Sequence, residues 1–264
     1  DEIIEKFQTT EALGSLLDVH GTLEDAFDAS KTQSELTDYH DSAHQSLHSF
    51  LIALQRAVEE RTSDSFGEQN LRSFLHLLVV LTQDYDVALM NPPYGSSGRM
   101  PKDVRTYVDE RYDYTNEYYI NFFEACNRFT KSSGRIGMIV QRSFMYKHSF
   151  EEFREDFIGK LGAFDFLAEF GNGVLDNATV RTAGTVVRTD TNRNIEGTFF
   201  RLHDRSSDEK EGTYLRAAFS QESGDIQRKY VRDLSEFEMI PGSPLSYWVP
   251  PQLRSLYSES IVLD

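Results

Sequence analysis

The chain has 264 residues, of which 39% are hydrophobic and 12% aromatic, so it can bury a sizeable core and is not of the disordered class. No apolar run approaches the roughly 18 residues of a membrane span, the first residues are acidic, and there is a single cysteine. These features argue against a membrane protein, a secretory signal, a disulfide framework and a cysteine zinc cluster, and we expect a cytoplasmic protein.

The formal net charge of -16 is unexpected for a protein that approaches phosphates. Either nucleic acid is not the partner, or the acid is a general surface adaptation and basic residues are kept for one face. The basic charge is carried mainly by arginine, and acidic residues are spread along the whole chain. This pattern resembles halophilic proteins of salt-rich cytoplasm.

Residues 1–83 are expected to form a mainly helical N-terminal part. Apolar residues recur at helical spacing over residues 32–80, with one polar break. His40, His44 and His48 recur every fourth residue and would share one stripe of a helix. Such stripes are more often solvated than metal-binding, and no further ligand is evident, so no metal site is predicted.

Residues 84–203 are expected to form an α/β core. The apolar run over residues 86–90 predicts a buried strand, which stops at two consecutive prolines because proline donates no ladder hydrogen bond. A helix is predicted over residues 116–129, with Cys126 on its inward face as a small buried hydrophobe.

A second buried strand is predicted over residues 134–141, entered through a turn at residues 132–134. Ser149, followed three residues later by Glu152, forms a capping box that predicts the start of a helix. Further strands are expected at residues 164–170, 179–188 and 198–203. This order of elements favours a parallel sheet finished by an antiparallel edge. Residues 204–264 are expected to form a charged surface region and a connector towards a recognition region.

The motif Asn91-Pro92-Pro93-Tyr94, with the aspartate-flagged apolar strand before it, resembles motif IV of adenine-specific methyltransferases. A Gly/Ser loop, a helix that begins near Glu117 and the strand at residue 134 follow in the order found in the large methylases of BREX (PglX-like) phage defence and in type IIG restriction-methylation enzymes. The resemblance extends over roughly residues 84–251. It implies a Rossmann-like S-adenosylmethionine-dependent methyltransferase core and double-stranded DNA with a flipped adenine as partner, along with other subunits of a defence system.

The chemistry of methyl transfer to an exocyclic amine explains these residue types. The amide oxygen of Asn91 and the carbonyl oxygen of Pro92 can accept hydrogens from the amine and hold it for attack on a methyl sulfonium. Proline rigidity fixes the carbonyls, Pro93 is assigned to substrate binding, and Tyr94 can stack on an extruded adenine. The alternative reading of the tetrapeptide is a rigid turn without chemistry.

Five further residues are candidates for binding. Arg99, Lys102 and Arg105 follow the motif and could contact the DNA backbone, with exposed surface charge as the alternative. Asp86 and Glu117 are assigned to cofactor binding, since Glu117 matches a position where the family often has an aspartate near the cofactor.

A complete enzyme of this class carries a Phe-x-Gly-x-Gly turn after its first strand, and none lies upstream of Asn91. The core is therefore expected to be incomplete on its N-terminal side, and an isolated fragment of this extent need not be active. Two alternatives remain open. The same tetrapeptide serves methylation of cytosine amines and of protein glutamine amides, and a fragment could also be a non-catalytic DNA-binding or scaffolding piece.

Overall fold

The computed structural model describes residues 40–59, 66–95, 97–115, 117–156, 162–175, 180–189 and 196–260, together with Leu16, Asp18 and Gly21. The chain divides into two compact units, Asp1–Asp84 and Tyr85–Asp264. Each unit is described by itself. Within the described residues, no helix combines the length and the apolar character needed to cross a membrane.

The described residues of the first unit form two helices, α4 (His40–Glu59) and α5 (Phe66–Leu81), which pack against each other, while the predicted helical residues 32–39 lie outside the described part. The helices predicted from the apolar spacing are thus confirmed. The imidazole Nδ1 of His48 lies 3.3 Å from the hydroxyl oxygen of Thr82, so this histidine bonds to the residue that follows α5. The side chains of the other two histidines of the stripe lie outside the described residues.

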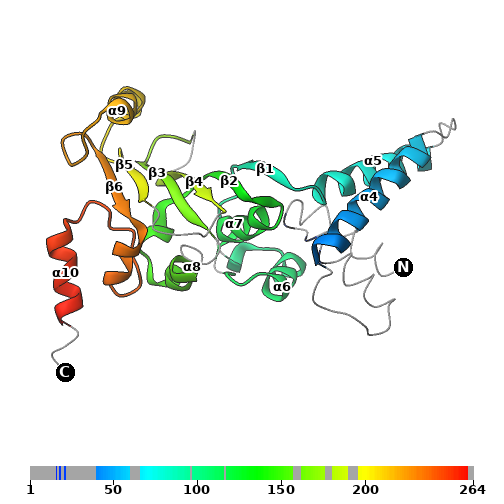
Figure 1. The fold of residues 1–264 in the computed structure, drawn as a ribbon, viewed down its shortest axis with the longest axis horizontal. Helices are drawn as coiled ribbons and strands as arrows, with labels where there is room; N and C mark the ends of the chain where they lie inside the picture. Colours follow the sequence, from blue (N-terminus) through cyan, green and yellow to red (C-terminus); the bar gives the residue numbers. More distant parts are fainter. Residues whose placement is uncertain are drawn as a thin grey trace. The chain divides into compact units, whose positions relative to one another are not determined.

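The second unit is built on one mixed sheet of six strands in the order β1-β2-β4-β3-β5-β6 (Figure 1). The strands are β1 (Tyr85–Met90), β2 (Thr130–Gln141), β3 (Ala163–Gly171), β4 (Thr182–Arg188), β5 (Glu196–Arg201) and β6 (Lys229–Asp233). The pairs β1/β2 and β3/β5 are parallel, and the other neighbours are antiparallel. The five strands predicted from the sequence are confirmed as strands.

Three details of the predicted sheet were wrong. The strand β1 was expected to be buried, but it lies at the edge of the described sheet, where Val87 is 53% and Leu89 is 79% exposed. The antiparallel strand β4 lies inside the sheet between β2 and β3, although β6 does form an antiparallel edge. The segment between β3 and β4 is shorter than the dozen or so residues that a parallel crossover requires, so β4 must return antiparallel. Residues 132–134, predicted as a turn before the strand, lie within β2 at an irregularity, where the pairing with β1 passes from Thr130 opposite Tyr85 directly to Arg135 opposite Val87. Gly134 packs so close to β1 that a Cβ there would lie 2.8 Å from the carbonyl oxygen of Asp86.

Helices cover both faces of the sheet (Figure 1). They are α6 (Lys102–Arg111), α7 (Tyr118–Arg128) and α8 (Glu151–Asp156) on one side and α9 (Ser207–Phe219) on the other, with α10 (Pro251–Ser260) following the last segment. The helix predicted after Ser149 begins at Glu151, because Ser149 lies in a short 3-10 helix, η4 (His148–Phe150). Charged α6 and α9 were not predicted.

The core lies between the sheet and α7 and α8. Phe144 stacks on Phe164 of β3, with ring centroids 5.8 Å apart, and meets Phe153 of α8 edge to face at 6.2 Å. Cys126 of α7 is fully buried, as predicted, and burial raises the pKa of its thiol to about 12. On the opposite face, Ala217 of α9 packs against Phe200 of β5 and its neighbours.

The segment at residues 240–250 is tied to this core through its backbone. Arg154, which is 2% exposed, donates hydrogen bonds to the carbonyl oxygen of Gly242 at 2.6 and 2.8 Å. The same guanidinium donates to the carbonyl oxygens of Phe144 at 2.9 Å and Lys147 at 2.7 Å. One buried side chain therefore ties two separate stretches of backbone, residues 144–147 and Gly242, to α8.

Candidate active-site loop at the carboxyl end of β1

The loop Asn91–Tyr94 begins where β1 ends, because its two prolines cannot continue the ladder. Since β1 and β2 are parallel, the carboxyl ends of both strands lie at the same edge of the sheet. The side chain of Asn91 is exposed, Pro92 is buried, Pro93 is exposed and Tyr94 is half-buried. The structure thus presents an amide on a rigid loop at the edge where ligands of open α/β sheets collect.

Tyr94 ties this loop to β2. Its hydroxyl oxygen lies 2.9 Å from the carbonyl oxygen of Ile139 and 3.2 Å from Oδ1 of Asn91. Burial raises the pKa of the Tyr94 hydroxyl, so the group keeps its proton at neutral pH and can donate. The sequence did not indicate Ile139, whose contribution is a backbone atom.

Glu117 lies beside the loop at the start of α7. The N–H of Tyr118 donates to the carbonyl oxygen of Gly95 at 3.1 Å, which holds the beginning of α7 against the end of the loop. Glu117 is half-buried, and burial raises the pKa of its carboxyl group while the charges of Lys147 and Arg99 act in the opposite direction. A half-buried carboxylate thus lies beside the end of the loop, within the electrostatic influence of two cations, of which Lys147 was not anticipated.

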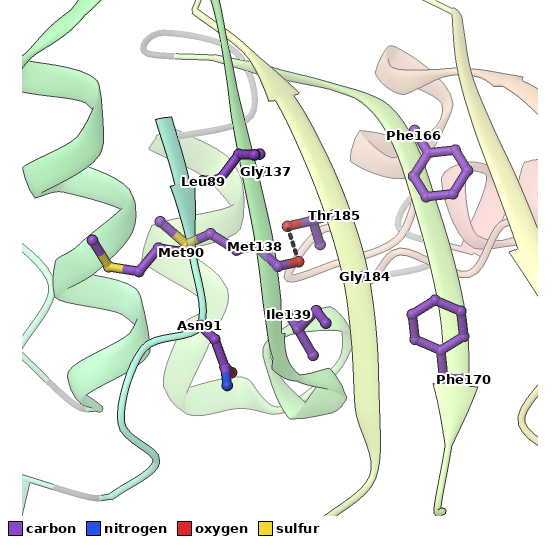
Figure 2. Close-up of a pocket in the computed structure, with 10 residues that line it drawn as sticks. All are labelled: Leu89, Met90, Asn91, Gly137, Met138, Ile139, Phe166, Phe170, Gly184 and Thr185. Carbon is purple, nitrogen blue, oxygen red and sulfur yellow. Dashed lines mark hydrogen bonds between the residues drawn. The ribbon is translucent and has the colours of Figure 1, made fainter. Parts of the chain in front are cut away.

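A cavity of about 490 Å³ opens on the sheet face opposite α7 and reaches Asn91. Figure 2 shows Leu89 on β1 and Ile139 on β2 at one side of it, and Phe166 and Phe170 standing on β3 at the other. Leu89 is 79% exposed, so this part of the face has no cover within the described residues.

The floor of the cavity depends on two glycines. A Cβ on Gly137 would lie 2.6 Å from Cδ2 of Leu89, and one on Gly184 would lie 2.7 Å from the ring of Phe170. Both distances are shorter than real Cβ contacts, so an alanine at either position would require Leu89 or Phe170 to move from its present place against the sheet.

The other predicted binding residues are more dispersed. Asp86 is exposed near the start of β1, about 16 Å along the strand from the motif at roughly 3.3 Å per residue, and its carboxylate pairs with Nζ of Lys131 at 2.8 Å. Lys102 and Arg105 are exposed on α6, where Arg105 lies 3.6 Å from the carboxylate of Asp109. The structure brings Arg99 and Glu117 to the loop, and the roles of all five residues stay predictions.

A buried polar network, which was not predicted, lies along the same edge of the sheet. Glu169, at the end of β3 and 2% exposed, forms an ion pair with Arg142, which directly follows β2. Its other oxygen accepts a hydrogen bond of 2.7 Å from the hydroxyl of Tyr247. This network fixes residues 240–250 to the carboxyl edge of the sheet.

Comparison with known proteins shows which family model covers the residues of this loop. The sequence model of the Eco57I restriction-modification methylase family matches residues 8–170, which is more than half of the chain and includes the loop. The chain belongs to this family. The expected resemblance to restriction-modification and BREX methylases is thereby confirmed. The mixed sheet with helices on both faces, in a member of a methylase family, confirms the expected α/β methyltransferase class of the fold.

The curated relatives that match this chain are much longer proteins. The chain is 29% identical over 259 residues to the adenine-specific methyltransferase PglX of Lacticaseibacillus casei, covering 94% of this chain and 20% of that protein. It is 24% identical over 227 residues to the adenine-specific methyltransferase BrxX of Escherichia coli, covering 84% and 18%. The chain thus spans about a fifth of the length of these curated relatives.

Among solved structures, the methyltransferase subunit of a type I restriction-modification system from Streptococcus thermophilus matches with a TM-score of 0.46 and 15% identity. That match covers 69% of this chain and 46% of the other.

Proposed function

We propose that the polypeptide carrying this chain transfers a methyl group from S-adenosylmethionine to the exocyclic amine of adenine in double-stranded DNA, within a phage-defence or restriction-modification system. The observation that carries the proposal is the position of Asn91-Pro92-Pro93-Tyr94, a rigid loop with an exposed amide at the carboxyl end of β1, in a member of a methylase family. The names of the two curated relatives support adenine as the target.

The loop residues account for the reaction. The amine of adenine is a poor nucleophile because its lone pair is delocalised into the ring. Two acceptors, the Asn91 amide oxygen and the Pro92 carbonyl oxygen, can bind its two hydrogens and orient the nitrogen for attack. The nitrogen gains the methyl group and loses one proton to water, so this chain needs no general base of shifted pKa.

The described residues fit one wall of a cofactor site. S-adenosylmethionine, when bound, supplies an electrophilic methyl group together with ammonium and hydroxyl groups that require acceptors. Glu117 offers a half-buried carboxylate beside the loop, where a hydrogen bond is worth more than in water. Asp86 is the weaker candidate for this role, because its carboxylate already pairs with Lys131.

Charge near the loop supports contact with phosphates. Arg99 and Lys147 lie close enough to Glu117 to oppose the rise of its pKa, and Lys102 and Arg105 are exposed on the following helix. Cations placed this way position a DNA backbone without reading its sequence. The net charge of -16 is then explained by acidic residues on the rest of the protein surface, as in halophilic proteins. Such a protein would bind and methylate DNA in a salt-rich cytoplasm.

The test uses the full-length protein, incubated with S-adenosylmethionine labelled in its methyl group and with DNA, RNA or protein. Label is expected at the exocyclic amine of adenine in DNA. Asn91→Ala should lower the rate on the order of 100-fold or more, since it removes one positioned acceptor, and should leave the melting temperature nearly unchanged. Asn127→Ala, at a half-buried site on α7, is the matched control.

Each other outcome has a definite meaning. Label on cytosine, RNA or protein glutamine would replace adenine as the target, and no label at all would favour the non-catalytic scaffold. A rate for Asn91→Ala within about threefold of wild type would remove the loop from the chemistry.

A further inference from the structure

The hydroxyl of Tyr94 has two oxygen neighbours and only one proton. The carbonyl oxygen of Ile139 can only accept, and at 2.9 Å it is the nearer of the two. Once the proton points there, the Tyr94 oxygen is left as an acceptor. The atom of Asn91 that lies 3.2 Å away should then be a donor.

Asn91 can supply that donor by a rotation of its amide. The oxygen and nitrogen of an asparagine side chain exchange places when the amide turns by half a revolution, and the hydrogen-bond network decides between the two orientations. With Nδ2 facing Tyr94, the network becomes a continuous relay from Asn91 Nδ2–H to the Tyr94 oxygen and from the Tyr94 hydroxyl to the carbonyl of Ile139. The amide oxygen of Asn91 then lies on the side away from Tyr94.

We propose that Tyr94 is a positioning residue that fixes the orientation of the Asn91 amide and leaves its oxygen free to accept from the substrate amine. The inference rests on the proposed function and adds a role for the hydroxyl that differs from stacking of the ring on a base. Within the described part of the chain, Tyr94 is the only hydrogen-bond partner of the Asn91 side chain.

The opposite orientation of the amide would be unproductive. It would present the NH2 group of Asn91 to an amine, so that two donors would face each other and the amine would lose one of its acceptors. Asn91 is exposed, and within the described residues the hydroxyl of Tyr94 is the hydrogen-bonding contact that can restrict the rotation of its amide. The half-buried ring and the bond to β2 hold that hydroxyl in place.

The experiment separates the contribution of the Tyr94 hydroxyl from the contribution of its aromatic ring. In the full-length protein, Tyr94→Phe keeps the ring for stacking and removes the relay. We expect kcat for adenine methylation to fall about 10-fold, on the scale of one neutral hydrogen bond, while KM for DNA stays unchanged. Fluorescence of 2-aminopurine at the target position, which reports base extrusion, should also be unchanged. Tyr257→Phe, at an exposed site on α10, is the matched control.

The same substitution of Tyr94 is also made in a variant that carries Asn91→Asp. A loss caused by poor folding would be the same in both proteins, whereas a loss caused by the orientation of the amide would not. Asn91→Asp replaces the amide by a carboxylate with two equivalent acceptors, which needs no orientation. In that background, adding Tyr94→Phe should cost about twofold or less, so the two substitutions should be strongly non-additive.

Several results would overturn the inference: a kcat for Tyr94→Phe within about threefold of wild type, a raised KM with unchanged kcat, or equal losses in both backgrounds. Any of these would leave the proposed function standing. Absence of adenine methylation by the wild-type protein would instead overturn the proposed function, and the inference with it.

Discussion

Glu124 of α7 allows a quantitative test of the packing around this helix. Its carboxylate is buried and accepts hydrogen bonds from the backbone N–H groups of Asp113 at 2.9 Å and Tyr114 at 3.0 Å, which fixes the segment between α6 and α7. Burial raises the pKa of Glu124 from 4.5 to about 7, against the opposing effect of the two N–H groups and Arg128.

The direction of the pH effect follows from this pKa. Between pH 4.5 and about 7 the folded chain keeps a proton that the unfolded chain has released, so stability falls as the pH rises through this window and is level above it. Each power of ten in proton affinity is worth about 1.4 kcal/mol, so the loss attributable to Glu124 is about 3 kcal/mol.

The perturbation is Glu124→Gln, which cannot ionise. An amide offers only one acceptor oxygen, so one backbone N–H is left unpaired at a cost of about 1–3 kcal/mol, and wild type should be the more stable protein at pH 5. The difference should shrink by about 3 kcal/mol towards pH 8 and can change sign, because only wild type loses stability through this group.

Urea denaturation from pH 5 to pH 8, followed through Trp248 as the single tryptophan, measures this difference in the unit that contains Glu124. A difference between wild type and variant that stays constant to within about 0.5 kcal/mol would refute the reasoning. If the two N–H groups instead held the carboxylate charged, its pKa would be depressed, and the change in the difference would fall below pH 4.5 and leave the range from pH 5 to pH 8 level.

Two further predictions concern the cavity floor and the surface charge. Gly184→Ala should destabilise the sheet by about 1–3 kcal/mol, because the new methyl group would meet the ring of Phe170, whereas Gly98→Ala, with open space around it, should change stability little. Equal urea midpoints for these two variants would contradict the packing described for Phe170. The melting temperature should rise with KCl, because molar salt shortens the Debye length to roughly 3 Å and screens the repulsion behind the net charge of -16, while DNA affinity falls. A melting temperature that is flat or falls from dilute buffer to molar salt would show that the acidity has another cause.

Elements with strong local signals could be predicted from the sequence. The strand β1 and the loop after it follow from an apolar run that meets two prolines, and α7 follows from aromatic residues at helical spacing. By contrast, α6 buries only Val104 and Val108 within a charged run, and α9 turns the small residues Thr213 and Ala217 inwards. Such helices are held by tertiary contacts, which leave little periodicity in the sequence.

The candidate site could be located from the sequence, but its connections could not. The motif identifies Asn91 and Tyr94 from adjacent residues, whereas the acceptor for the Tyr94 hydroxyl is a backbone atom of Ile139, 45 positions away. The interior place of β4 likewise depends on which strands pair across the sheet. Long-range partners of this kind are set by the topology of the sheet, and no local pattern in a single sequence indicates which residues will pair.

The hydrogen bonds of Arg154 to Gly242, Phe144 and Lys147 have a consequence for sequence divergence. All the acceptors are backbone carbonyl oxygens, which every amino acid provides. Among residues 240–250, side chains that make no such anchoring contact can therefore drift without loosening this attachment, provided that Arg154 remains. Two positions are exceptions: Gly242, whose φ of 78° and closeness to the Glu151 carboxylate disfavour a side chain, and Tyr247, whose hydroxyl bonds to Glu169. A homologue could thus change other positions of this segment and still dock it in the same place, as long as the arginine, the glycine and the tyrosine are kept.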